Sequence, residues 1–121
     1  MTTAPKSILI ADDDPAMLRL YTRIFSDKDY SITMAASFAE ARGCIEMSSY
    51  DLLITDLMLM DGLGTELVKL FEKKRAGAKS LLVTGSDPSE KELAVAGVYE
   101  CLDKPFNVEH FLSAVDGALG A

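Results

Sequence analysis

Five short apolar segments alternate with segments of helical periodicity along this chain, and this alternation restricts its possible folds more than any other feature. The apolar segments are SILIA (7–11), SITMAA (31–36), LLIT (52–55), SLLVTG (80–85) and the weaker YECLD (99–103). Strands that alternate with helices are typical of βαβ units, and strands that are apolar on both faces indicate a parallel sheet covered on each side. The sequence therefore predicts a doubly wound α/β fold of the (βα)5 type with a five-stranded parallel sheet.

The starts of the predicted helices carry capping residues. An N-cap residue followed by proline, or a Ser/Thr with Glu three positions later, supplies hydrogen-bond acceptors to the first N–H groups of a helix. Such starts occur at Asp14-Pro15, 37–40, 87–90 and Asn107. We therefore expect Asp14 to be a helix cap rather than part of a binding site.

Length and charge limit the domain count and the classes of partner. The chain has 121 residues with 49% hydrophobic content, which fits one compact domain. Its net charge of -7 argues against direct nucleic-acid binding and permits divalent cations and basic or mixed protein surfaces. The apolar runs are shorter than the roughly 20 residues of a membrane span. We expect a tail at residues 1–6, a single domain at 7–121, and a cytoplasmic location.

Polar side chains follow four of the five predicted strands. Ligands bind an open parallel sheet at the carboxyl ends of its strands, so these residues should share one edge. They are Asp12 and Asp13 after the first strand, Asp56 after the third, Thr84 after the fourth and Lys104 after the fifth. Asp56 continues an apolar run, and a buried charge needs a partner. Lys104 and a bound cation are the partners that this edge offers.

The residue types at this edge indicate magnesium and phosphate chemistry. Carboxylates without His or Cys select a hard cation, and Mg²⁺ is more consistent with them than Zn²⁺. Lys104 adds a positive charge, and the hydroxyl of Thr84 can donate to a phosphoryl oxygen. Phosphoryl transfer to a carboxylate requires mainly positioning and neutralisation of charge. We therefore predict such a transfer at this site.

The motifs ILIADDD, DLLITDLMLMDGLG, LLVTGS and LDKPF, in this order and spacing, resemble the receiver domain of two-component response regulators. The resemblance extends over residues 6–120. It implies a flavodoxin-like sheet with strand order 2-1-3-4-5. It also implies a phosphorelay protein rather than an enzyme, with at most self-phosphorylation and self-dephosphorylation activity. Its partners would be a sensor histidine kinase or a histidine phosphotransfer protein and an unknown downstream protein.

The resemblance assigns a role to each residue of the acidic site. Asp56 matches the residue that accepts the phosphoryl group from a phosphohistidine. Asp13 matches a direct ligand of Mg²⁺, and Asp12 matches the neighbour that holds metal-bound water. The main-chain carbonyl of Met58 matches the third protein ligand.

The switch residues are assigned in the same way, with one departure. Thr84 matches the hydroxyl that turns inward after phosphorylation. Lys104 matches the lysine that pairs with the acceptor, and the Lys104–Pro105 bond is implied to be cis. Cys101 stands where the family usually has an aromatic residue that reports phosphorylation to the outer surface. Tyr99 lies two positions away, on the same face if the strand is regular, and so is a candidate substitute.

The resemblance implies that phosphorylation changes the surface of the fourth helix, fifth strand and fifth helix. The Cys101 departure keeps an alternative open, namely a phosphorylation-independent protein-interaction module. A haloacid-dehalogenase-type phosphohydrolase is disfavoured because its Asp-x-Asp motif would follow the first strand. Whether the chain is a stand-alone receiver or part of a larger regulator or hybrid kinase stays open, as does homodimerisation.

Overall fold

One parallel sheet and a small hairpin make up the β structure of the described part of the chain. The structure is a computed structural model that describes residues 5–85 and 97–120. The sheet contains β1 (Lys6–Ala11), β2 (Tyr30–Ala35), β3 (Leu52–Asp56), β6 (Lys79–Thr84) and β7 (Val98–Asp103). The hairpin contains β4 (Met58–Leu59) and β5 (Gly62–Leu63). The sheet order is β2-β1-β3-β6-β7, which is the predicted 2-1-3-4-5 order when the hairpin strands are not counted.

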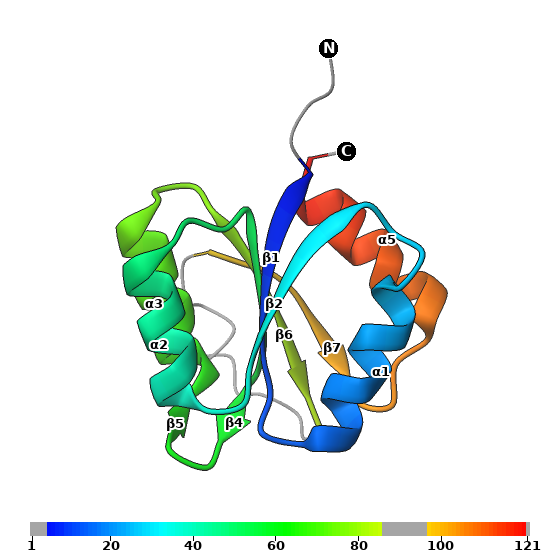
Figure 1. Cartoon of the computed structure of the whole chain (residues 1–121), viewed down its shortest axis with the longest axis horizontal. Coiled ribbons are helices and arrows are strands. Elements are labelled where there is room, and N and C mark those ends of the chain that lie inside the picture. Colours follow the sequence, from blue (N-terminus) through cyan, green and yellow to red (C-terminus); the bar gives the residue numbers. More distant parts are fainter. Residues whose placement is uncertain (1–4, 86–96, 121) are drawn as a thin grey trace.

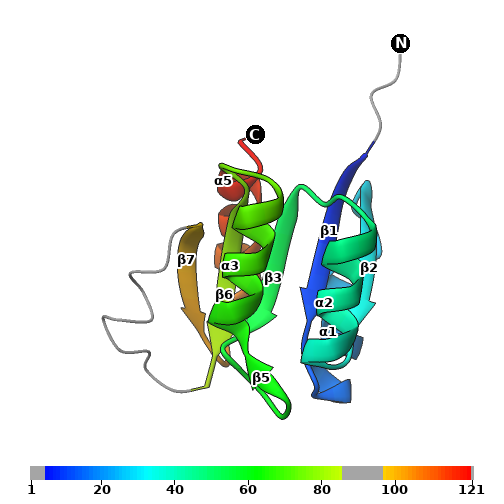
Figure 2. The same ribbon diagram turned by 90° about the vertical axis from the view of Figure 1, so that its left-hand side faces the viewer.

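Among the described residues, helices lie on both faces of this sheet (Figure 1). α1 (Pro15–Phe25) and α5 (Val108–Ala118) lie on one face, and α2 (Phe38–Met47) and α3 (Gly64–Lys74) lie on the other. Figure 2 shows α2 and α3 in front of the sheet. The doubly wound (βα)5 prediction is confirmed for this part of the chain. No helix within the described ranges has the length and apolar character needed to span a membrane.

Three of the four helix starts predicted from capping residues are present. The side chains of Asp14, Ser37 and Asn107 accept hydrogen bonds from first-turn N–H groups of α1, α2 and α5. α3 begins after Leu63 without a side-chain cap. The start predicted at 87–90 lies outside the described residues. Local capping chemistry therefore fixes where three of the described helices begin.

The central strands are buried on both faces, which accounts for their continuous apolar sequence. In β1, the side chains of Ile8 and Ile10 pack with α1 and α5, while that of Leu9 packs with α2 and α3. All three are completely shielded from solvent. Two apolar clusters, one on each face, thus hold β1 and β3 rigidly in the middle of the molecule.

The start of β1 and the end of β3 each extend one residue beyond the predicted strands. β1 begins at Lys6, which pairs with Tyr30 of β2, so Lys6 belongs to the sheet rather than to the tail expected at residues 1–6. Residues 1–4 of that predicted tail lie outside the described residues. β3 extends to Asp56, which pairs with Val83 of β6. The acceptor candidate is therefore the last residue of a central strand.

β7 contains an irregularity that separates Tyr99 from Cys101. Its register relative to β6 shifts at Ser80, and such a bulge inserts an extra residue that reverses the alternation of side chains. Cys101 packs with the cluster under α2 and α3. The hydroxyl of Tyr99 instead lies against Gly117 of α5. The expectation that Tyr99 shares a face with Cys101 is wrong, because it assumed a regular strand.

Candidate functional site

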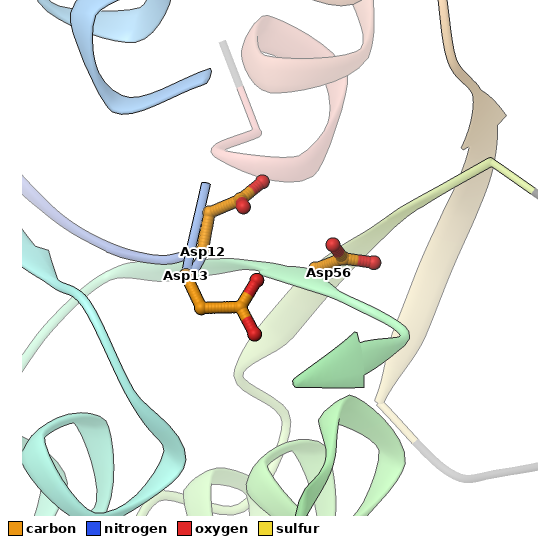
Figure 3. Close-up of side chains that lie close together, drawn as sticks. All are labelled: Asp12, Asp13 and Asp56. Atoms are coloured by element: carbon orange, nitrogen blue, oxygen red, sulfur yellow. The ribbon is translucent and has the colours of Figure 1, made fainter. Parts of the chain in front are cut away.

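Three carboxylates meet at the carboxyl edge of the sheet (Figure 3). Asp12 and Asp13 follow β1, and Asp56 ends β3. These two strands are adjacent and paired in register up to Ala11 and Thr55. One oxygen from each carboxylate lies within 4.8 Å of the others. The structure thus brings together the three acidic residues that the sequence placed at one edge.

Asp12 is the buried member of this cluster, with no exposed surface. Its Oδ1 accepts a hydrogen bond from the N–H of Asp14 at 2.8 Å, and its Oδ2 accepts one from Nζ of Lys104 at 3.2 Å. Burial raises the pKa of the Asp12 carboxyl, although both hydrogen bonds favour its charged form. The fold therefore holds this charge at an energetic cost.

Lys104 supplies the cation that Asp56 requires. Its Nζ donates to Oδ2 of Asp56 at 3.0 Å as well as to Asp12. Burial opposes the charged form of Lys104, but the hydrogen bond to Asp56 and the negative charges of Asp12 and Asp56 outweigh it, so its pKa is raised. The Lys104–Pro105 bond is cis, as the resemblance implied. One ammonium thus serves two carboxylates.

The β4–β5 hairpin borders the site on the other side. The N–H of Met60 donates to Oδ2 of Asp13 at 2.8 Å, and the N–H of Met58 donates to Oδ1 of Asp56 at 3.2 Å. These bonds place the backbone of Met58 beside Asp56. Sequence reasoning assigned Met58 by resemblance and did not foresee the contact between Met60 and Asp13.

Thr84 lies at the same edge, at the end of β6. Its side chain is buried, and its carbonyl accepts a hydrogen bond from the N–H of Lys104 at 2.8 Å. The residue before it, Val83, is the pairing partner of Asp56 on the neighbouring strand. Thr84 therefore stands beside the acceptor candidate, and its main chain is joined directly to that of Lys104.

The acidic cluster fits a hard cation. Its donors are carboxylate oxygens, without histidine or cysteine in the cluster found among the described residues. Three carboxylates face one ammonium, so two negative charges are left without a counterion from this cluster. Such an oxygen-rich, anionic site is typical of Mg²⁺ and Ca²⁺ and unlike the nitrogen and sulfur sites of Zn²⁺. The pocket could therefore bind a divalent metal ion.

The main chain of Asp56 approaches Gly64 so closely that a side chain at this position would not fit. A Cβ at Gly64 would overlap the carbonyl oxygen of Asp56 and lie 3.0 Å from its carbonyl carbon. We expect Gly64→Ala to lower the free energy of unfolding by about 1–3 kcal/mol, because backbone atoms must move to admit the methyl group. Denaturant-induced unfolding measures this change.

Gly43→Ala is the matched control, since Gly43 lies in α2 and a Cβ there would meet no atom within 4 Å. Alanine is the better helix former, so this change should stabilise the protein by about 0.5–1 kcal/mol. Equal effects at the two glycines would contradict the close approach of Gly64 to Asp56.

Comparison with known proteins agrees with this geometry. The family model for the response regulator receiver domain matches residues 8–116. The transcriptional regulatory protein GlrR of Escherichia coli (strain K12) is 31% identical over 121 residues, which cover 98% of this chain and 27% of that protein. NtrC of Bradyrhizobium sp. (strain RP501 Parasponia) is 29% identical, over 93% of this chain and 24% of NtrC. The chain thus spans about a quarter of the length of these relatives.

Solved structures extend the similarity to three dimensions. A CheY-like response regulator receiver domain protein from Methanospirillum hungatei JF-1 is 33% identical with a TM-score of 0.89, and the alignment covers 96% of this chain and 94% of that one. A response regulator receiver protein from Sinorhizobium medicae WSM419 has a TM-score of 0.88 at 22% identity, covering 97% and 96% of the two chains, and shows the shared fold. Receiver domains are signalling domains rather than conventional enzymes. This chain belongs to the receiver domain family of two-component response regulators.

Proposed function

We propose that Asp56 accepts a phosphoryl group from the phosphohistidine of a sensor histidine kinase or a histidine phosphotransfer protein, in a reaction that depends on Mg²⁺. The observation that carries the proposal is the position of Asp56. Its carboxylate is within 4.8 Å of those of Asp12 and Asp13 and hydrogen-bonded to Lys104. Acidic groups that can hold a cation and an ammonium that can meet phosphoryl oxygens thus lie next to one nucleophile.

Asp56 acts as the nucleophile. A carboxylate oxygen attacks phosphorus, the new P–O bond forms as the P–N bond to the partner's imidazole breaks, and the imidazole leaves with the electron pair of that bond. The N–H of Met58 and the ammonium of Lys104 hold the two oxygens of Asp56 in place. Lys104 then pairs with the phosphoryl oxygens, since its ammonium already lies beside the nucleophile.

Asp12, Asp13, Asp56 and the carbonyl of Met58 would hold the magnesium ion. When bound, it would reduce the repulsion between the acidic cluster and the incoming phosphoryl group. The carboxylates fit this role because their charge exceeds what Lys104 alone can balance. Asp13 is the member best placed for direct ligation, because Lys104 bridges the other two carboxylates.

Thr84 and Lys104 transmit the effect of phosphorylation at Asp56 to the surface of the domain. Thr84 binds a phosphoryl oxygen through its hydroxyl, and its carbonyl is bonded to the N–H of Lys104. Movement at either residue therefore acts on the ends of both β6 and β7. The surface that changes for the downstream partner comprises β7, α5 and the predicted fourth helix, whose start at 87–90 lies outside the described residues. This is a bistable element biased by a local change of charge.

A small phosphodonor with and without Mg²⁺ tests the proposal. We expect intact mass spectrometry to show one added phosphoryl group in the presence of Mg²⁺ and little or none in the presence of a chelator. The repulsion among the carboxylates accounts for this difference. Addition at the same rate in chelator would contradict the role of the metal, and no addition under either condition would contradict the acceptor function.

A phosphorylation-independent interaction module is the second candidate; its only support is the environment of Cys101, and the complete acidic cluster of Asp12, Asp13 and Asp56 argues against it. Cys101 has too little bulk to replace an aromatic switch residue, and Tyr99 lies against α5 rather than on the same face. Unchanged affinity for a downstream partner before and after phosphorylation of Asp56 would support this candidate. A change in affinity would support the switch.

A further inference from the structure

The turn of the β4–β5 hairpin has little packing of its own. Each strand has two residues, a length that does not form a stable hairpin by itself in water. Met60, in the turn, is 95% exposed. Yet the N–H of this same residue donates to Asp13 in the acidic cluster. Burial of Leu59 in the cluster under α2 and α3 anchors β4, but residues 60 and 61 of the turn are exposed, so a polar attachment is needed to fix the turn itself.

Asp61 supplies that attachment. Its Oδ1 accepts a hydrogen bond from the N–H of Phe38 at 2.8 Å, and its Oδ2 accepts one from the N–H of Ala39 at 3.1 Å. Both donors belong to the first turn of α2, where N–H groups have no partner within the helix and negative charge is favoured. Gly62, the next residue, packs against the ring of Phe38. Asp61 thus binds the hairpin to an element more than twenty residues away in the sequence.

The start of α2 also has caps of its own. The hydroxyl of Ser37 accepts a hydrogen bond from the N–H of Glu40 at 3.0 Å, and the carboxylate of Glu40 accepts one from the N–H of Ala36 at 3.2 Å. The first bond is that of a capping box, and the second reaches the residue before the N-cap, so both form without the hairpin. What Asp61 adds is therefore a connection between α2 and the turn.

We propose that Asp61 is a positioning residue for the acceptor site. It fixes the turn on α2, the turn fixes the N–H of Met60, and that N–H holds Oδ2 of Asp13. Oδ1 of Asp13 is then oriented for the cation. This inference rests on the proposed function, because it assigns Asp61 a part in preparing the Mg²⁺ site.

Asp61→Ala tests the proposal by calorimetric titration with Mg²⁺ and by the rate of phosphoryl addition from a small phosphodonor. Partners that orient a metal ligand typically contribute 10–100-fold in affinity, and Asp61 acts one step further away, so we expect Mg²⁺ binding to weaken by about 3- to 10-fold. At saturating Mg²⁺ the rate should recover most of its wild-type value. A rate that stays equally low at saturating Mg²⁺ would overturn the proposal.

Ser37→Ala is the matched control, because it removes a cap from the same helix without touching the hairpin. It should lower thermal stability as Asp61→Ala does and leave Mg²⁺ affinity unchanged. If both variants weaken Mg²⁺ binding alike, Asp61 has only a structural role. Asp61→Asn separates charge from hydrogen bonding, since its single oxygen retains one acceptor. It should bind Mg²⁺ with intermediate affinity, and affinity equal to that of Asp61→Ala would overturn the proposal in favour of charge alone.

Amide hydrogen exchange of Met60 in metal-free protein distinguishes this proposal from the proposed function. Exchange should accelerate in Asp61→Ala and not in Ser37→Ala, because only the former releases the turn. If exchange responds in this way but the wild-type protein takes up neither Mg²⁺ nor a phosphoryl group, the link from Asp61 to Asp13 stands and the proposed function fails. Unchanged exchange in Asp61→Ala would overturn the link itself.

Discussion

Asp56→Asn should reduce phosphoryl addition from a small phosphodonor to background, as measured by intact mass over time in the presence of Mg²⁺. The neutral amide is a far weaker nucleophile than a carboxylate and forms no acyl phosphate. Asparagine has nearly the same shape, so the fold should persist. The change also removes one of three mutually repelling carboxylates, and the free energy of unfolding without metal should not fall.

Asp51→Asn is the control, because Asp51 directly precedes β3 and Asp56 ends it. Asp51 accepts a hydrogen bond from the N–H of Ser7 at 2.8 Å and pairs with Arg75 at 2.9 Å, far from the acidic cluster. Its pKa is lowered by these contacts, so its replacement should cost stability while phosphoryl addition continues. Phosphorylation of Asp56→Asn at the wild-type rate would refute the assignment of the acceptor.

Lys104→Met should have the largest effect on stability in the absence of metal. Asp12 and Asp56 would lose their shared ammonium while remaining shielded, with side chains 1% and 13% exposed. Breaking a fully buried pair typically costs roughly 3–5 kcal/mol, and we expect about 2 kcal/mol here because the Lys104 side chain is 21% exposed. Added Mg²⁺ should stabilise the variant more than the wild-type protein, because the ion replaces the lost positive charge. Urea unfolding with and without Mg²⁺ measures both effects.

The pH dependence of the same variant gives a second test. The pKa of Lys104 is raised above 10.5, so its contribution to stability is fully present below that value and is lost as pH rises through the folded pKa. Burial already raises the pKa of Asp12 above 3.8, and removal of Lys104 should raise it further. The variant should therefore regain stability as pH falls, and its deficit should narrow from neutral to mildly acidic pH.

Lys69→Met provides the comparison, since Lys69 pairs with Glu66 at 3.5 Å and both side chains are more than half exposed. We expect Lys69→Met to lower the free energy of unfolding by less than about 0.5 kcal/mol. Added Mg²⁺ should not change this loss. An equally small loss of stability in Lys104→Met would contradict the proposal that Lys104 stabilises Asp12 and Asp56. A loss that grows as the pH falls would contradict it too.

The sheet and its carboxyl edge could be predicted because each strand is marked by the residues of one short, contiguous segment. Segments such as LLIT are apolar at every position, which is what a strand covered on both faces requires. Once the strands were placed, parallel topology alone brought Asp12, Asp13 and Asp56 together. The pairing of Lys104 with Asp56 followed from the need of a buried carboxylate for a cation.

Contacts that depend on tertiary geometry could not be predicted. Nothing in the sequence connects Asp61 with the start of α2, more than twenty residues away. The bulge in β7 has no local signal either, although it decides which face Tyr99 occupies. In both cases the spacing of residues was known, and the path of the backbone was not.

The excess of acidic groups at the carboxyl edge has a consequence for how this sequence can vary. The three carboxylates repel one another, and the apolar clusters on the two faces of the sheet sustain that local instability. Neutral substitutions in the cluster should therefore yield proteins that fold as well as the original or better while losing the chemistry. Screening for thermal stability alone would favour such variants, because the proposed activity requires negative charges at these positions and thermal stability is higher without them.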